Sequence, residues 1–144
     1  MSTTMITTAT TTAAQSPIRT SRRAVWTAGL VSGAVASVAT TVTAAVASAA
    51  DAALTIDGEE IPLLGFAQMT MLGAVIGTVL AWAFSKWASR PRRTFVATTV
   101  ALTALSLVPD VVVNASTVTK LVLMATHVVA AAIVVPTVAK RLSA

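Results

Sequence analysis

The stretch of sequence that decides the fold is FVATTVALTALSLVPDVVVNASTVTKLVLMATHVVAAAIVVP, residues 95–136. Two long apolar runs in this stretch meet at a short polar hinge. The first run carries an acidic residue, Asp110, directly after Pro109, and the second carries His127, the only histidine of the chain. Apolar runs of about 20 residues are typical of helices that cross a membrane. We therefore expect two membrane-spanning helices here, with one acid and one histidine inside them.

The composition of the whole chain agrees with a membrane protein. Of its 144 residues 56% are apolar and 10% are charged, whereas about 25% are charged in an average globular domain. The absence of cysteine excludes disulfides and thiolate zinc sites. The net charge of +5 comes from short clusters beside apolar segments, and no basic face carries interleaved aromatic residues. We therefore expect a lipid bilayer, and no nucleic acid, as partner.

Two further apolar segments precede the stretch quoted above. We expect helices at residues 24–49, 62–84, 95–113 and 120–139, within a single transmembrane domain over residues 24–140. Residues 1–23 are rich in Thr and Ala and end in a basic cluster, so a disordered cytoplasmic tail is expected there. The predicted fold is all-α, a four-helix bundle that spans the membrane.

The first apolar segment also resembles a secretory signal peptide. It follows basic residues and contains Ala47-Ser48-Ala49, which is similar to a cleavage site. Its apolar run is longer than the 7–15 residues typical of a signal core. We expect the segment to be retained as a helix, with cleavage as the alternative.

The distribution of Lys and Arg predicts the topology. The N-terminal tail, the second loop and the C-terminus carry three, four and two of them, whereas the first and third loops carry none and one. Lys and Arg stay on the cytoplasmic side of a membrane. We therefore expect an antiparallel up-down-up-down bundle in the plasma membrane with both termini in the cytoplasm. The first loop holds four acids and an Asp57-Gly58 turn signal, which is typical of a solvated outer loop.

Small residues predict how the first two helices pack. Gly29 and Gly33 belong to a stripe of small residues along the first segment, and Gly73 and Gly77 form a GxxxG motif in the second. Such residues allow helix backbones to approach closely in a membrane. We expect the two segments to pack tightly through these glycines.

Polar residues form a stripe along the third segment. Thr99, Thr103, Ser106 and Asp110 follow helical spacing on one face, and Asn114 continues it. Pro109 predicts a kink or a helix end. Because the fourteen residues before Pro109 are too few to span a membrane, we expect a kinked helix that continues to about residue 113.

Two interpretations of these polar residues remain open. In the first, Asp110, His127, Ser106, Thr103 and Asn114 form an outward-facing polar pocket, with Asp110 and His127 as a proton or ligand site. Ionisable groups inside a membrane favour this interpretation. In the second, Asp110 pairs with Lys120 at the interface, and His127 donates to a threonine or backbone oxygen of a neighbouring helix.

The second half of the chain resembles a known family. The motifs are Arg90-Pro91-Arg92-Arg93-Thr94, Leu105-Ser106-Leu107-Val108-Pro109, and His127 followed nine residues later by Pro136. They are similar to a domain-of-unknown-function family of small actinobacterial membrane proteins. The resemblance implies four membrane helices over about residues 24–140, and it implies no activity. Many members of that family have a second proline at the position of Asp110.

The sequence contains no Rossmann glycine pattern, P-loop, HExxH or GxSxG. We therefore expect no enzymatic activity, no cofactor and no metal site. The leading hypothesis is a structural, accessory or envelope-associated membrane protein. The alternative is a minimal transporter or channel subunit that uses the polar pocket. The sequence leaves open a protein partner or a homo-oligomer.

Overall fold

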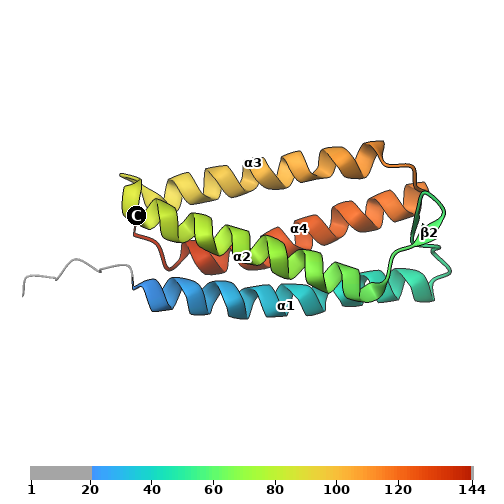
Figure 1. Cartoon of the computed structure of the whole chain (residues 1–144), viewed down its shortest axis with the longest axis horizontal. Helices are drawn as coiled ribbons and strands as arrows, with labels where there is room; N and C mark the ends of the chain where they lie inside the picture. The colour runs from blue at the N-terminus through green and yellow to red at the C-terminus, as the bar shows by residue number, and fades with distance from the viewer. Residues whose placement is uncertain (1–20, 144) are drawn as a thin grey trace, which may run out of the picture.

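The structure, a computed structural model, describes residues 21–143, which form four α-helices and one short β-hairpin (Figure 1). The prediction of a helical protein with four membrane-length helices is confirmed, because each helix is long and apolar enough to cross a membrane. Most of the expected tail, residues 1–20, lies outside the described residues. The elements are α1 (Arg22–Ala49), β1 (Thr55–Ile56), β2 (Glu59–Glu60), α2 (Leu63–Trp87), α3 (Pro91–Val112) and α4 (Thr117–Ala139).

The helices extend further into the polar segments than the apolar runs predicted. α2 ends at residue 87 rather than 84, α3 begins at 91 rather than 95, and α4 begins at 117 rather than 120. Pro91 occupies the start of α3, where its missing N–H is not needed. Ser116 caps α4, because its hydroxyl accepts a hydrogen bond from the backbone N–H of Thr119 at 3.1 Å. Hydropathy therefore locates the apolar part of each helix but not its polar end turns.

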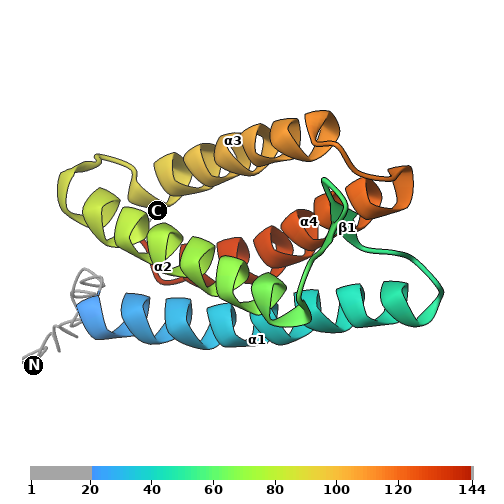
Figure 2. The ribbon, with the colours of Figure 1, turned by 45° about the vertical axis from the view of Figure 1, so that its right-hand side comes forward.

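The helices lie side by side, and the connections between them alternate between the two ends of the molecule (Figure 1). α1 and α3 lie on opposite sides of the pair formed by α2 and α4 (Figures 1 and 2). α1 packs along α2 and α4, whereas α3 contacts α4 and α2 and makes no comparable contact with α1. α3 is thus the outer helix on its side of the bundle.

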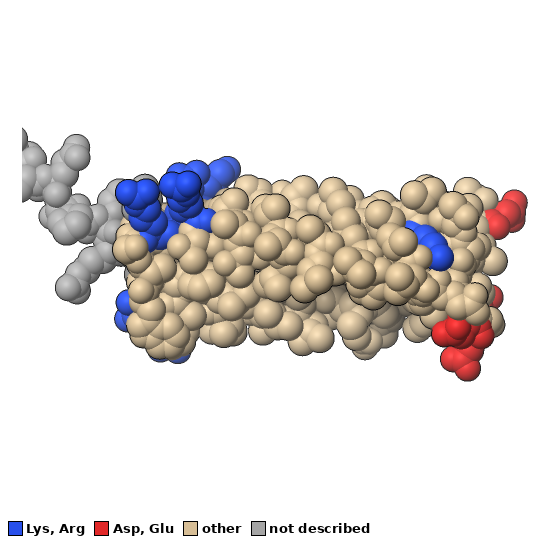
Figure 3. Space-filling view, turned by 90° about the horizontal axis from the view of Figure 1, so that it is seen from above, with Lys and Arg blue, Asp and Glu red and all other residues tan. Residues whose placement is uncertain are grey.

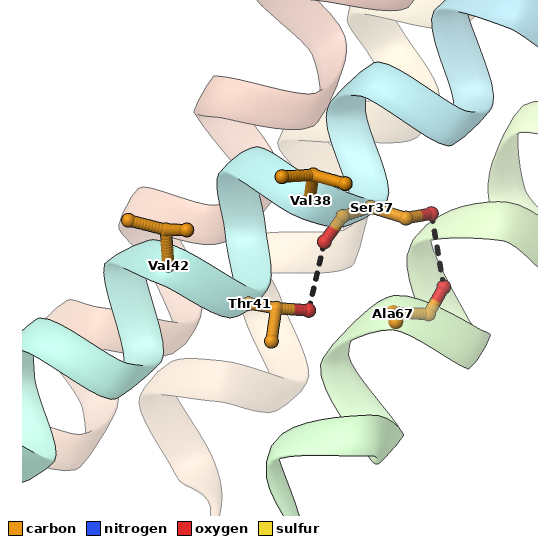
Figure 4. A pocket seen from close by; sticks show the side chains of 5 residues that line it. All are labelled: Ser37, Val38, Thr41, Val42 and Ala67. Atoms are coloured by element: carbon orange, nitrogen blue, oxygen red, sulfur yellow. Dashed lines mark hydrogen bonds between the residues drawn. The ribbon is translucent and has the colours of Figure 1, made fainter.

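The tightest packing is between α1 and α2, and it depends on Gly29 and Gly33. A Cβ atom at Gly29 would collide with the side chain of Thr78, and one at Gly33 would lie 2.7 Å from the Cβ of Ala74. Further along α1 the hydroxyl of Ser37 donates to the carbonyl of Ala67 on α2 at 3.1 Å (Figure 4). The small residues of α1 therefore bring the two backbones close together.

The GxxxG motif of α2 does not take part in this packing, which corrects the expectation for Gly73 and Gly77. A Cβ atom at either position would meet nothing within 4 Å. The residues of α2 that α1 covers are Ala74 and Thr78, one position further along the helix and about 100° around it. α2 carries two adjacent faces of small residues, and the alanine–threonine face is the one that packs against α1.

The buried core is concentrated in α1, α2 and α4. The larger apolar cluster lies toward the end where the chain passes from α2 to α3, and it includes Val25, Phe95 and Val138. A smaller cluster, made of Ala44, Leu54 and Phe66, lies at the hairpin end. α3 buries few side chains, because none of its residues between Thr99 and Asp110 is buried. Its middle therefore stands away from the rest of the bundle.

The acidic loop after α1 is an ordered cap. Asp57 and Gly58 both have positive φ, +52° and +86°, and they form the turn of the antiparallel β1–β2 hairpin. This turn was predicted from the Asp-Gly pair. The backbone N–H of Asp57 donates to the carbonyl of Asn114, and the hydroxyl of Thr119 donates to the carbonyl of Ala53, both at 3.0 Å. Hydrogen bonds thus join the hairpin to the α3–α4 loop, and the segment before the hairpin to the first turn of α4.

Charges of opposite sign gather at opposite ends of the described molecule (Figure 3). Basic residues lie at the start of α1, in and on either side of the α2–α3 connection, and after α4, while the acids other than Asp110 lie in the hairpin cap. Lys120 is a basic residue near the acidic end. The long surface between the two ends is almost free of charge (Figure 3).

Candidate functional site: a groove between α2, α3 and α4

Asp110 and His127 meet where α3 returns to the bundle. Asp110 lies in the last turn of α3, which continues through Pro109 and ends at Val112, one residue before the expected end. Its Oδ2 atom is 2.9 Å from Nδ1 of His127 on α4. The Asp110 side chain is 11% exposed and that of His127 is 41% exposed. The structure thus brings together the two ionisable groups of the first interpretation.

The contact is electrostatic rather than a well-directed hydrogen bond. Nδ1 of His127 also lies 3.0 Å from the backbone carbonyl of Leu123, one turn earlier in α4. The carbonyl is in hydrogen-bond geometry with the ring, whereas Oδ2 of Asp110 is buried without a directed hydrogen-bond partner. Because Nδ1 faces two oxygens and no donor, we assign the ring proton to Nδ1. The other ring nitrogen, Nε2, makes no hydrogen bond to the described residues.

The second interpretation named the wrong hydrogen-bond and ion-pair partners for Asp110 and His127. Lys120 does not pair with Asp110, because its Nζ donates to the carbonyl of Val111 at 2.8 Å. His127 bonds to a carbonyl of its own helix rather than of a neighbouring one. His127 follows the first residue of α4, Thr117, by ten residues, which is about 15 Å along the helix.

The polar stripe of α3 lines a groove. Thr99, Thr103 and Ser106 form one wall of a groove of about 670 Å³ between α2, α3 and α4, and His127 lines it from α4. Gly73 and Gly77 form part of the α2 wall. Asp110 contacts His127 but does not itself line the groove. Asn114 lies exposed in the α3–α4 loop. Three of the five expected pocket residues therefore line the groove, Asp110 contacts one of them, and Asn114 lies apart.

Three hydroxyl groups of this groove form hydrogen bonds within their own helices. Thr99 donates to the carbonyl of Phe95 at 2.8 Å, and Ser106 donates to that of Thr103 at 2.7 Å. On α4 the hydroxyl of Thr126 donates to the carbonyl of Leu123 at 2.7 Å. These bonds leave methyl and methylene groups as much of the exposed wall. The groove is therefore far less polar than the sequence of the stripe indicates.

A smaller cleft of about 220 Å³ lies on the other side of the bundle, between α1 and α2. Val38 and Val42 line its α1 side together with Ser37 and Thr41, and the hydroxyl groups of the latter two are bonded to backbone carbonyls (Figure 4). Neither cleft holds a metal-binding cluster: within residues 21–143 no three His, Asp or Glu side chains converge.

Sequence reasoning missed the α2 wall of the groove. Gly73 and Gly77 were assigned to packing against α1, but they provide space opposite the polar stripe of α3. The available signal was the second pair of small residues, Ala74 and Thr78, which has the same spacing as the glycines. Two candidate packing faces one residue apart indicate that one of them is left free.

Comparison with known protein families identifies the family of this chain. A family model described as "Family of unknown function (DUF6069)" matches residues 20–144. The chain belongs to this family. The match agrees with the resemblance seen in the second half of the sequence, and it covers the described helices completely. No curated protein and no solved structure shows a significant match to the chain. Membership in this family assigns no activity to the groove.

Proposed function

We propose that this protein is a small multi-pass component of the plasma membrane with a structural or accessory role in the envelope. In this proposal both ends of the chain lie in the cytoplasm, and the hairpin cap lies on the outer side. The segregation of charge supports this orientation, because Lys and Arg stay on the cytoplasmic side. The exposed Trp87 beside the basic connection is typical of an anchor in an anionic leaflet.

The observation that carries the accessory role is the bonding of the stripe hydroxyls. A path for ions or protons needs groups that can replace water along its length. Thr99 and Ser106 direct their hydroxyl hydrogens to carbonyls of α3, so neither has a hydrogen left to donate to a chain of water molecules or to a permeating anion. The stripe is the feature on which the transporter alternative depends, and its geometry favours an apolar occupant.

The same geometry favours a protein without catalysis. An acid and a histidine in contact are two members of a hydrolase triad, and Ser106 lines the groove beside His127. The hydroxyl of Ser106 donates to the carbonyl of Thr103 rather than to the imidazole. The nucleophile and base of such a triad must be within hydrogen-bond reach, so this serine is not activated by His127.

Flux measurements in proteoliposomes test the proposal against the transporter alternative. The purified protein is reconstituted with a pH-sensitive dye inside the vesicles, and a pH step or a salt gradient is applied. We expect the rate of pH change to equal that of empty vesicles, for the wild-type protein and for Asp110→Asn. A flux that the wild type supports and Asp110→Asn abolishes would overturn the accessory role in favour of transport.

A further inference from the structure

We propose that two basic segments, at the start of α3 and directly after α4, together bind the headgroup of a membrane lipid that carries two phosphates. The surface they form consists of Arg92, Arg93, Lys140 and Arg141 and is called the composite basic surface below. The inference rests on the membrane location of the proposed function, to which it adds a ligand. It depends neither on the orientation in the membrane nor on the absence of transport.

The fold joins these two segments, which are far apart in the sequence. The backbone N–H of Arg92, in the first turn of α3, donates to the carbonyl of Ser143 at 3.3 Å. Arg141 precedes Ser143 by two residues, so their Cα atoms are at most about 7 Å apart. The chain after α4 thus turns toward the start of α3 (Figures 1 and 2). Two pairs of basic residues therefore lie on adjacent segments.

Buried apolar residues hold the two segments in place. Leu142 is 6% exposed and belongs to the larger core cluster, together with Phe95 of α3 and Val138 of α4. Pro91, the first residue of α3, is also buried. The four residues of the composite basic surface are exposed beside these anchors. The surface is therefore built on ordered backbone rather than on a loose tail.

No acidic side chain offsets the charge of this surface. Of the five acids in the chain, Asp110 lies in the last turn of α3 and the other four lie at the hairpin end. The four neighbouring cations therefore repel one another without internal compensation. The pair on α3 also stands at the start of a helix whose first turn holds no acid, where the helix dipole disfavours cations and favours anions. A bound anion offsets both of these costs.

The anions available at this end are lipid phosphates. The four helices are long and apolar enough to cross a membrane, so the basic end lies at the level of the headgroups. All three tryptophans of the chain lie at the same end, Trp26 near the start of α1 and Trp82 and Trp87 in the last turns of α2. Tryptophan is enriched at this level of a membrane, and basic surfaces between helix ends are a known form of lipid-headgroup site.

The division of the surface into two pairs of cations favours two linked phosphates. Arg92 with Arg93 and Lys140 with Arg141 can each bind one phosphate through charge-assisted hydrogen bonds. Two lipids with one phosphate each must be held separately. When both phosphates belong to one headgroup, binding of the first places the second at high effective concentration. At equal membrane charge the surface therefore selects a headgroup with two phosphates.

Quenching of tryptophan fluorescence by brominated lipids tests this proposal, because all three tryptophans lie at the basic end. The purified protein is reconstituted in phosphatidylcholine vesicles that contain either brominated cardiolipin or twice as much brominated phosphatidylglycerol. The two kinds of vesicle then match in charge, in phosphate and in bromine. We expect the wild type to bind cardiolipin about three- to tenfold more tightly than the matched phosphatidylglycerol, a small part of the gain that linked groups can provide.

Matched variants locate the site. Arg92→Gln combined with Arg141→Gln removes one cation from each pair, and we expect the preference for cardiolipin to disappear. Arg23→Gln combined with Lys86→Gln removes the same charge from the same end of the molecule, at exposed positions of α1 and α2, and should keep the preference. Far-UV circular dichroism shows whether each variant is folded, and flotation with the vesicles shows whether it is inserted.

Three results would overturn the site. Equal quenching of the inserted wild type by the two lipids would show diffuse attraction to an anionic surface. Equal loss of the preference in both double variants would show that total charge, and not the composite basic surface, selects the lipid. Loss of the preference on addition of pyrophosphate at constant ionic strength would assign the surface to a soluble phosphate. Both leaflets of the vesicles have the same composition, so none of these results depends on orientation or on the flux experiment, and the two proposals fail separately.

Discussion

Two pairs of glycines with the same spacing have opposite surroundings in this molecule. Gly33 lies against Ala74, whereas Gly77 borders the groove with nothing near it. We expect Gly33→Ala to destabilise the protein by about 1–3 kcal/mol, because the added methyl group overpacks the α1–α2 contact. Gly77→Ala should be neutral or stabilise by up to about 1 kcal/mol, since alanine favours the helix. Unfolding in mixed micelles, followed by far-UV circular dichroism, measures both. Equal losses for the two variants would contradict the assigned packing face.

The contact between Asp110 and His127 can be measured as a coupling energy. A double-mutant cycle of Asp110→Asn and His127→Gln should give a coupling above about 0.6 kcal/mol, the average for polar pairs between membrane helices, and no more than about 1.7 kcal/mol, the largest such value. Asp110→Asn combined with Ser37→Ala is the control, and their effects should add within about 0.5 kcal/mol because the sites share no partner. A coupling no larger than that of the control pair would show that the two side chains do not interact in the folded protein.

Residue spacing predicted which polar groups share a helix face, but not their partners. The period of 3.6 put Thr99, Thr103, Ser106 and Asp110 on one face of α3, and three of them line one groove wall. Lys120 and His127 are seven residues apart and share a face of α4, so the choice between them as partner of Asp110 depends on the position of α4 along its axis relative to α3. That position is set by packing against α1 and by the Thr119–Ala53 bond, neither of which a helix period contains.

At the scale of elements, α3 is the helix that the sequence described least completely. Its span and its polar stripe were predicted, but its separation from the bundle was not. Most of its apolar residues between Thr99 and Asp110 are exposed, and apolar residues facing lipid have the same composition as residues facing a core. Hydropathy therefore cannot distinguish a helix packed along its length from one that contacts the bundle near its ends.

The attachment of α3 at its basic end is testable through Phe95, which is fully buried in the larger core cluster. We expect Phe95→Ala to destabilise the protein by about 3 kcal/mol, because it leaves a cavity at one of the two places where α3 contacts the bundle. Leu105→Ala, at an exposed position of the same helix, should cost less than about 1 kcal/mol. The same micelle unfolding assay compares them. Similar losses for both variants would mean that α3 packs evenly along its length.

At the scale of the whole molecule, the charge asymmetry predicts the orientation in the membrane. The chain contains no cysteine, so single cysteines can be introduced one at a time, with Glu59→Cys in the hairpin cap and Ser89→Cys in the α2–α3 connection. Both positions are exposed. Because the basic end should face the cytoplasm, a membrane-impermeant maleimide added to intact cells should label Glu59→Cys and not Ser89→Cys. Permeabilised cells should show labelling of both, which controls for reactivity. Labelling of Ser89→Cys in intact cells would reverse the proposed orientation and place Asp110 nearer the cytoplasmic side.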